Sequence, residues 1–231
     1  MKIDRKAMYF ERMAESHEWD DFANPRETTR RLQIIFDFFL KDLDLKGLLL
    51  LDAGSGGGHF SARARKGGAH IVAMDLGKSL LTKVRAKTGC RTVLGDLAEP
   101  PFSPGCFDVV LCTEVIEHTR HPESVLISLS SLVKPGGRLV LTSPGKPWQP
   151  VVRLATRLGF RRHEGYENFL WPGRCVSVLE STGLMVKEVQ GFNILPLFHP
   201  WLDPLHTWCE MTAGKKIPWL FVNYGILAYR P

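Results

Sequence analysis

The chain has 231 residues, of which 44% are hydrophobic and 23% are charged, a composition typical of a globular protein with a substantial core. A formal net charge of +6 permits an acidic partner but is too small to indicate one. The five cysteines form no CxxC pair, and no apolar run reaches the roughly 18 residues of a membrane span, which argues against a disulfide framework, a zinc cage and a membrane-spanning helix.

The N-terminal segment, MKIDRKAMYFERMAESHEWDDF, is charged throughout and lacks the apolar core of a signal peptide. Together with the odd number of cysteines, this predicts a reducing, cytoplasmic environment. The first strongly periodic segment follows at 27–41, where ETTRRLQIIFDFFLK has apolar residues at helical spacing. We expect a helix there.

Five short apolar runs come next, each separated from the following one by a helix-like or loop-like segment. They are LLLLD at 48–52, AHIVAMD at 69–75, RTVLGD at 91–96, FDVVLCT at 107–113 and GRLVLTS at 137–143. Apolar runs without polar alternation are typical of parallel strands that are covered on both faces. Strands alternating with helices predict an α/β protein with a doubly wound parallel sheet.

The alternation ends after residue 145. Residues 147–174 are irregular, basic and aromatic, although Arg153 and Arg157 lie in a short stretch with the spacing of an amphipathic helix. Two more strands are predicted at 184–191 and 219–230. A long apolar loop at 192–218 would join them.

The segment GSGGG, residues 54–58, directly follows the first predicted strand, where ligands of open α/β sheets bind. Glycine lets the backbone approach a ligand closely, and the next helix offers free N–H groups, so a nucleotide-like ligand is predicted. A dinucleotide fingerprint would need a third glycine at position 59, which is His59. The pattern present is DxGxGxG, from Asp52 to Gly58.

Carboxylates at the ends of the next two strands help to decide between two classes of ligand, dinucleotides and S-adenosylmethionine. Asp75 can accept hydrogen bonds from two ribose hydroxyls, but dinucleotide-binding proteins also have an acid there. Asp96 is placed to accept a hydrogen bond from an adenine amino group, which favours S-adenosylmethionine. Either carboxylate could instead be a turn or helix-capping residue.

In these motifs the chain resembles the class I S-adenosylmethionine-dependent methyltransferases, particularly their ubiquinone-biosynthesis-like (type 11/23) branch. The resemblance covers roughly residues 27–145 and rests on Asp75 and on the segments LLDAGSGGG, GDLAEPPFSPGCFDVVLCTEVIEH and LVKPGGRLVLTSP. It implies a Rossmann-like, doubly wound, seven-stranded, mostly parallel sheet with an antiparallel last strand and a helical, aromatic lid. One domain is expected, with an N-terminal helical cap at 1–45, a cofactor-binding core at 46–145, and a substrate-side lid with the C-terminal strands at 146–231.

The resemblance also implies roles for individual residues in binding S-adenosylmethionine. The glycine loop and Thr113 would hold its methionine part, and Asp75 its ribose. Leu76, Asp96 and the amide of Leu97 would contact the adenine. The implied cofactor-binding residues are Asp52, Gly54, Ser55, Gly56, Gly58, Asp75, Leu76, Asp96, Leu97 and Thr113.

A sulfonium methyl group is already electrophilic, so a methyltransferase mainly aligns the acceptor and excludes water. If the acceptor is a hydroxyl, a histidine is the natural base. His163, in the segment RRHEGYENFLW, is the first candidate and His118, in EVIEH, the second, although each could be a structural or solvated histidine. His118 and His121 lack the partners of a metal site, and we predict none.

The acceptor side has two further features. The basic amphipathic stretch at 151–162, with Arg153, Arg157, Arg161 and Arg162, has a simple interpretation, a solvated helix face over the core. A more specific interpretation is an anionic or lipid-linked acceptor, or peripheral contact with a membrane. The aromatic segment NILPLFHPWLDPLHTWCEM predicts a lid over an apolar acceptor, or else a cover for the sheet edge. The aromatic residues of this lid are Phe192, just before the segment, and Phe198, Trp201 and Trp208 within it, and Phe10, Trp19 and Phe22 could cap the cofactor similarly.

The sequence thus favours methyl transfer to a small organic acceptor. The preferred reaction is O-methylation of a sugar, quinone, polyketide or lipid-linked intermediate. An RNA or protein methyltransferase is the first alternative, but it would need a recognition module or a broader basic face. A non-catalytic, cofactor-binding regulatory protein is the second alternative. The intact set of glycines and carboxylates argues against it.

Overall fold

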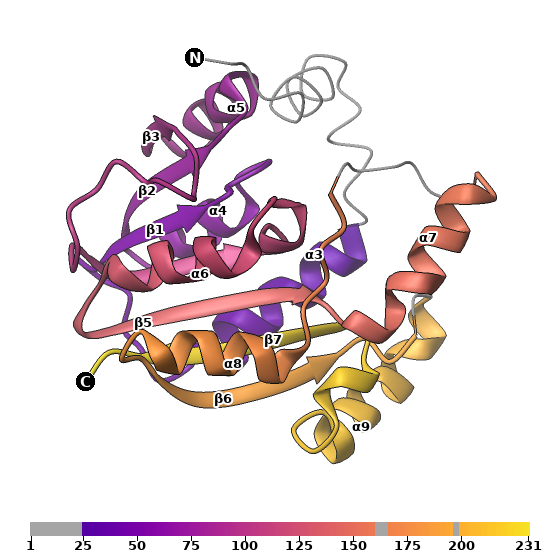
Figure 1. The fold of residues 1–231 in the computed structure, drawn as a ribbon. Coiled ribbons are helices and arrows are strands. Elements are labelled where there is room, and N and C mark those ends of the chain that lie inside the picture. Colours follow the sequence, from indigo (N-terminus) through magenta and orange to yellow (C-terminus); the bar gives the residue numbers. More distant parts are fainter. Residues whose placement is uncertain (1–24, 160–165, 196–198) are drawn as a thin grey trace.

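The computed structural model describes residues 25–231 except 160–165 and 196–198 (Figure 1). Its centre is a seven-stranded sheet with the order β3-β2-β1-β4-β5-β7-β6. The strands are β1 (Leu49–Ala53), β2 (His70–Asp75), β3 (Arg91–Leu94), β4 (Phe107–Thr113), β5 (Val133–Pro144), β6 (Met185–Phe192) and β7 (Asn223–Tyr229). The first five run parallel, and β7 pairs antiparallel with β5 and β6. The predicted mostly parallel sheet is confirmed.

Helices cover both faces of the sheet, because successive residues of a strand point to opposite sides. Leu50 packs with the N-terminal helical segment, α4 (His59–Lys66) and α5 (Lys78–Thr88). Leu51 packs on the other face with α6 (Pro122–Ser131) and α8 (Pro172–Ser181). Both α6 and α8 begin with a proline, whose fixed φ suits the first helical turn.

The helix predicted at 27–41 forms, but it has two parts. α3 (Pro25–Leu32) continues directly into the π-helix η1 (Gln33–Phe39), in which Ile34, Ile35, Phe36 and Phe39 are buried. α3 itself buries no residue and carries three arginines. The polar helix α3 therefore lies outside the core, while the apolar helix η1 anchors the segment to the sheet.

Short 3-10 helices and two further helices complete the described part of the chain. They are η2 (Ile116–His118), η3 (Lys146–Trp148), α7 (Gln149–Arg157), η4 (Pro200–Leu202), α9 (Asp203–Ala213) and η5 (Pro218–Leu220). The expectation of a loop throughout 192–218 is therefore wrong, since α9 lies within it. Among the described helices, none is long and apolar enough to cross a bilayer.

Candidate cofactor and active site

The glycine loop between β1 and α4 lies at the edge of the sheet where the parallel strands end. Gly54, Gly56 and Gly58 have φ angles of +79°, +47° and +71°, in the left-handed region that favours glycine. A Cβ atom on Gly54 would also lie only 2.4 Å from Cγ2 of Val115, which follows β4. The backbone therefore needs glycine here, and the result is a loop with Ser55 as its one side chain at the position expected for the cofactor.

Asp52, in β1, holds the glycine loop in position through its contacts with α4. Its Oδ2 atom accepts hydrogen bonds from the amide and the hydroxyl of Ser61 in α4, at 3.0 and 2.6 Å. The carboxyl group is almost fully buried, and this burial raises its pKa to about 6, while the bonds from Ser61 oppose the rise. The contacts of Asp52 join the end of β1 to the helix beyond the loop.

The pKa of Asp52 predicts how stability depends on pH. The unfolded chain ionises Asp52 near its usual pKa of 3.8 and the folded chain only near 6, so the free energy of unfolding should fall as pH rises between these values. Asp52→Asn keeps an oxygen for Ser61 and removes the buried charge. We expect it to gain up to about 3 kcal/mol over wild type at pH 8 and nothing near pH 4, as measured by urea unfolding.

The exposed Asp42→Asn variant is the control for this measurement, because that side chain has no burial cost to lose. A stability difference between Asp52→Asn and wild type that stays constant with pH would show that Asp52 does not titrate as described.

Asp75 connects the glycine loop to the end of β2. Its Oδ2 accepts the amide N–H of Gly56 and its Oδ1 accepts that of Gly77, both at 2.9 Å. The amides of Gly54 and Ser55 both donate to the carbonyl oxygen of Met74, at 2.8 and 3.1 Å. A carboxylate oxygen can accept more than one hydrogen bond, so an oriented Asp75 retains the capacity to accept ribose hydroxyls.

The residues predicted to contact adenine lie beside Asp75. The amide of Gly95 donates to the carbonyl oxygen of Asp75 at 3.1 Å, which places Asp96 next to the end of β2. Asp96 is exposed, and its Oδ1 accepts the amide of Ala98 at 2.9 Å. Leu76 is half-buried at the surface, whereas the side chain of Leu97 is buried in the core and only its backbone can face a ligand.

Among the buried hydroxyls without a hydrogen-bond partner in the described part of the chain, two lie at the ends of the neighbouring strands β1 and β4. They are Oγ of Ser55, after β1, and Oγ1 of Thr113, at the end of β4. A buried hydroxyl without a partner costs free energy, and such a group in a native site indicates a ligand or water that it binds. Both hydroxyls, together with the glycine loop, suit the charged amino-acid end of S-adenosylmethionine.

Glu114, immediately after β4, has an unusual backbone and unusual partners. Its φ is +53°, a region that non-glycine residues rarely adopt. Its Oε2 accepts Nδ2 of Asn223 at 2.8 Å and Nη2 of Arg31 at 3.2 Å, and Arg31 also contacts Glu27. Burial raises the pKa of Glu114, and Arg31 opposes that rise. Sequence reasoning missed Arg31 and Asn223, because no local pattern relates positions so far apart in the chain.

Of the two candidate bases, the described part of the chain includes His118 but not His163. His118 lies in η2, and its Nδ1 is 3.0 Å from the carbonyl oxygen of Tyr166, so Nδ1 donates and carries the proton. Its Nε2 lies 3.9 Å from Oε1 of Glu117. His163 lies outside the described residues, as does neighbouring Glu164.

The described end of the segment 161–171 packs against the residues after β4. The amide of Asn168 donates to the carbonyl oxygen of Glu117 and its Nδ2 to that of Thr119, both at 2.8 Å. This segment therefore approaches the candidate site from the side of η2. Among the described residues, no group of three or more histidine, cysteine or acidic side chains is placed to hold a metal ion.

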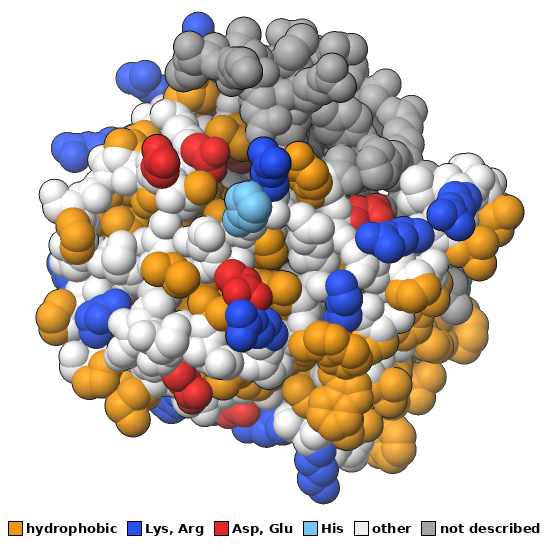
Figure 2. All heavy atoms as spheres, in the orientation of Figure 1, with side chains coloured by type: hydrophobic (Ala, Val, Ile, Leu, Met, Phe, Trp, Pro, Cys, Tyr) orange, Lys and Arg blue, Asp and Glu red, His pale blue; other side chains and the backbone are white. Residues whose placement is uncertain are grey.

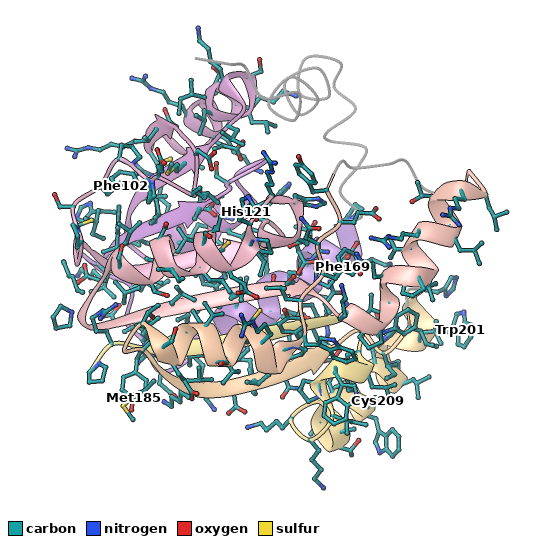
Figure 3. All side chains as sticks on the ribbon, viewed as in Figure 1. Phe102, His121, Phe169, Met185, Trp201 and Cys209 are labelled. Atoms are coloured by element: carbon teal, nitrogen blue, oxygen red, sulfur yellow. The ribbon has the colours of Figure 1, made fainter. Side chains whose placement is uncertain are left out.

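The described aromatic residues of the expected lid have different surroundings. Phe192 is buried in the core of the sheet, whereas Trp201 and Trp208 are 71% and 64% exposed. Figure 3 shows Trp201 at the outer side of the molecule. The expectation is therefore wrong for Phe192, because β6 holds its side chain in the core, and it stays a prediction for Trp201 and Trp208. The other proposed capping residues, Phe10, Trp19, Phe22 and Phe198, lie outside the described ranges.

Known proteins are similar to this chain in both sequence and fold. Residues 51–141 match a family model described as a methyltransferase domain. The ubiquinone biosynthesis O-methyltransferase of Xanthomonas euvesicatoria pv. vesicatoria is 30% identical over 201 residues, which cover 80% of this chain and 82% of that protein.

Solved structures agree with this relationship at the level of the fold. A chain from the complex of the Haloferax volcanii Trm112 methyltransferase activator with a methyltransferase has a TM-score of 0.71, at 17% identity and with 96% and 97% of the two chains covered. Magnesium protoporphyrin IX methyltransferase from Synechocystis PCC 6803, with bound S-adenosylhomocysteine, has a TM-score of 0.63, at 18% identity and with 87% and 83% covered. The chain belongs to the class I S-adenosylmethionine-dependent methyltransferases, in their ubiquinone-biosynthesis-like branch, and S-adenosylmethionine is its cofactor.

Proposed function

We propose that this methyltransferase transfers the methyl group of S-adenosylmethionine to a hydroxyl oxygen of a small, aromatic, lipid-linked acceptor of the quinone type. The observation that carries the proposal is the extent of the alignment with a ubiquinone biosynthesis O-methyltransferase. It covers 80% of this 231-residue chain, far more than the cofactor-binding core expected at 46–145. The similarity therefore includes segments on the acceptor side.

Within this proposal, the cofactor lies across the ends of β1, β2 and β4. Asp75 accepts the ribose hydroxyls, and Leu76, Asp96 and the amide of Leu97 contact the adenine. The orphaned hydroxyls of Ser55 and Thr113 support a place for the amino-acid end beside the glycine loop. The bound cofactor supplies an electrophilic methyl group, and the chain aligns the acceptor oxygen with it and excludes water.

Proton removal from the acceptor hydroxyl is assigned to a histidine. When Nδ1 of His118 donates to Tyr166, Nε2 is the basic nitrogen of the neutral ring, and the nearby carboxylate of Glu117 stabilises the protonated form. His163 remains the first candidate from the sequence, because its segment returns to η2 through Asn168.

A transfer assay with radiolabelled S-adenosylmethionine tests the function. The acceptors are phenols with and without an isoprenoid tail, sugars, and bulk tRNA. We expect label on the phenols and none on tRNA. Labelling of tRNA alone would favour an RNA methyltransferase, and S-adenosylhomocysteine binding without any transfer would favour the regulatory alternative.

The same assay separates the two histidines. Replacing the true base with glutamine should lower kcat by roughly a hundredfold or more while leaving S-adenosylhomocysteine affinity unchanged. We therefore compare His118→Gln and His163→Gln with His70→Gln, an exposed histidine at the start of β2. If both test variants turn over like wild type, neither histidine is the base.

A further inference from the structure

Four polar side chains form a continuous line through the apolar core between the sheet and helices α6 and α8. They belong to Cys175 in α8, Tyr224 in β7, Ser143 in β5 and Glu117 in η2. The first three are fully buried, and Glu117 is 2% exposed. Figure 2 shows the closed surface of side chains in front of this core, where Figure 1 places α6 and α8. We call these four residues the buried polar line.

Each member of the buried polar line contacts the next. Sγ of Cys175 lies 3.2 Å from the hydroxyl oxygen of Tyr224. Tyr224 and Ser143 are direct cross-strand partners in the pairing of β7 with β5, and their hydroxyl groups interact. The hydroxyl of Ser143 donates to Oε2 of Glu117 at 3.3 Å. The line therefore leads from helix α8 across two strands to a buried carboxylate.

The second oxygen of this carboxylate faces a candidate base. Oε1 of Glu117 lies 3.9 Å from Nε2 of His118. Because Nδ1 of His118 donates to the carbonyl oxygen of Tyr166, Nε2 is the nitrogen that can take a proton. One carboxylate thus has one oxygen on the hydroxyl of Ser143 and the other beside the basic nitrogen of His118.

The backbone of residues 166–170 runs along the same line. Every second residue of this segment contacts His118 or a member of the line through a backbone N–H or carbonyl group. The contacts are those of Tyr166 with His118 at 3.0 Å, Asn168 with Glu117 at 2.8 Å and Leu170 with Tyr224 at 3.3 Å. The segment therefore holds the histidine and the buried polar line in one arrangement.

Stability alone does not call for such a line. Polar groups in a core cost free energy that their hydrogen bonds at best offset, and apolar side chains of the same shape often stabilise a fold as well. Burial chiefly raises the pKa of Cys175 to about 12, and the negative charge of Glu117 adds to this rise. Burial also raises the pKa of Tyr224, and that of Cys112 in β4, well above their usual values. These three groups therefore stay neutral near pH 7 and add no charge change of their own around Glu117 and His118.

We propose that Ser143 and Tyr224 are positioning residues for methyl transfer, which hold the carboxylate of Glu117 against His118. The acceptor oxygen takes the methyl carbon from the sulfonium sulfur, which keeps the electron pair of the broken bond, and the hydroxyl proton passes to Nε2 of His118. The carboxylate oxygen at 3.9 Å stabilises the imidazolium that results. The hydrogen bond from Ser143 fixes the rotation of this carboxylate, and Tyr224 fixes Ser143 from the adjacent strand. The inference rests on the proposed function and selects His118 as the base.

Ser143→Ala tests the positioning role, because it removes one hydroxyl and adds no volume. We expect kcat with a phenol acceptor to fall roughly tenfold, the size of one hydrogen bond to a charged group, at wild-type affinity for S-adenosylhomocysteine. The ring titration of His118, followed by NMR in the S-adenosylhomocysteine complex, should move to lower pH, since a loosely held anion stabilises the imidazolium less. Glu117→Gln should change both quantities further in the same directions.

A double-mutant cycle tests whether Ser143 acts through Glu117. In the Glu117→Gln background, Ser143→Ala should change kcat by less than about twofold, because the charge that the hydroxyl positions is already absent. Tyr224→Phe should lower kcat severalfold by itself and should have little further effect when residue 143 is alanine. A merely structural role predicts equal effects in both backgrounds.

Ser130→Ala is the matched control. This serine is also fully buried, and its hydroxyl donates to the carbonyl oxygen of Leu126 at 2.7 Å near the end of α6. The variant loses the same chemical group from another buried position, so it should keep the wild-type kcat and the wild-type titration of His118. Urea unfolding of each variant measures the separate cost in stability, and His118→Gln identifies the signal of His118 in the spectrum.

Three results would overturn the positioning role. They are an unchanged titration of His118 in Ser143→Ala, an effect of Ser143→Ala on kcat that is as large in the Glu117→Gln background, and wild-type turnover by His118→Gln. The proposed function fails separately. If Ser143→Ala shifts the titration but the wild-type protein methylates no phenol, the proposed acceptor is wrong and the positioning role stands. If phenols are methylated but the titration does not move, only the positioning role is wrong.

Discussion

Replacing Asp75 with alanine is expected to weaken S-adenosylhomocysteine binding about a thousandfold. The alanine variant would lack the two charge-assisted hydrogen bonds that the Asp75 carboxylate makes with ribose hydroxyls, each contributing about 1.5 to 3 kcal/mol. It would also lose the bonds that hold Gly56 and Gly77, so the loop would have to be ordered on binding. Isothermal titration calorimetry measures the change directly.

Two variants define the specificity of this effect. Asp75→Asn keeps one acceptor oxygen and should have intermediate affinity. Asp44→Ala removes an exposed carboxylate far from the loop and should bind like wild type. Wild-type affinity in a folded Asp75→Ala protein would exclude the ribose role.

Arg31→Met is expected to destabilise the fold by about 3 kcal/mol at pH 8. Removing one partner of a buried ion pair leaves the other charge uncompensated, and Glu114 is only 15% exposed. Burial already raises the pKa of Glu114, and loss of Arg31 would raise it further. The folded variant then holds a proton that the unfolded chain releases, so the penalty should grow as pH rises and shrink near pH 5. Urea unfolding at both pH values checks the magnitude and the sign.

The double variant Arg31→Met with Glu114→Gln should recover most of this loss, because the more buried of the two carboxylates that Arg31 contacts no longer carries a charge. Arg26→Met is the matched control on the same helix. Arg26 pairs with Asp203 at 3.3 Å, but the two side chains are 48% and 63% exposed, so its loss should cost less than about 1 kcal/mol. Equal destabilisation by Arg26→Met and Arg31→Met would contradict a special role for the buried pair.

Much of the fold could be predicted because a continuous apolar strand has few stable environments. The run at 48–52 indicates burial on both faces, and Leu50 and Leu51 indeed pack in opposite cores. Helix α9 could not be predicted in the same way. Its apolar residues face outward and its buried residues include His206 and Glu210, so a search for a core-facing apolar stripe misses it.

The residues of the candidate site also differ in whether the sequence could predict them. Asp52 and Asp75 were predictable, since a carboxylate at the end of a buried strand meets the loop that follows it. The cluster of Arg31, Glu114 and Asn223 was not, because its members meet only when the N-terminal helix, β4 and β7 are assembled. Sequence spacing reports contacts within an element or between neighbouring elements and contains no information about such distant meetings.

The connection between β6 and β7 is closed at its base. The amide of Val222 donates to the carbonyl oxygen of Asn193 at 2.8 Å, and Nδ2 of Asn193 donates to Oδ1 of Asn223 at 3.2 Å. Because the two ends are joined to each other, the length and composition of the residues between them can change without altering the pairing of the strands. The residues between these two ends can thus be exchanged as a unit and present a different surface, while the strands that position the glycine loop stay the same.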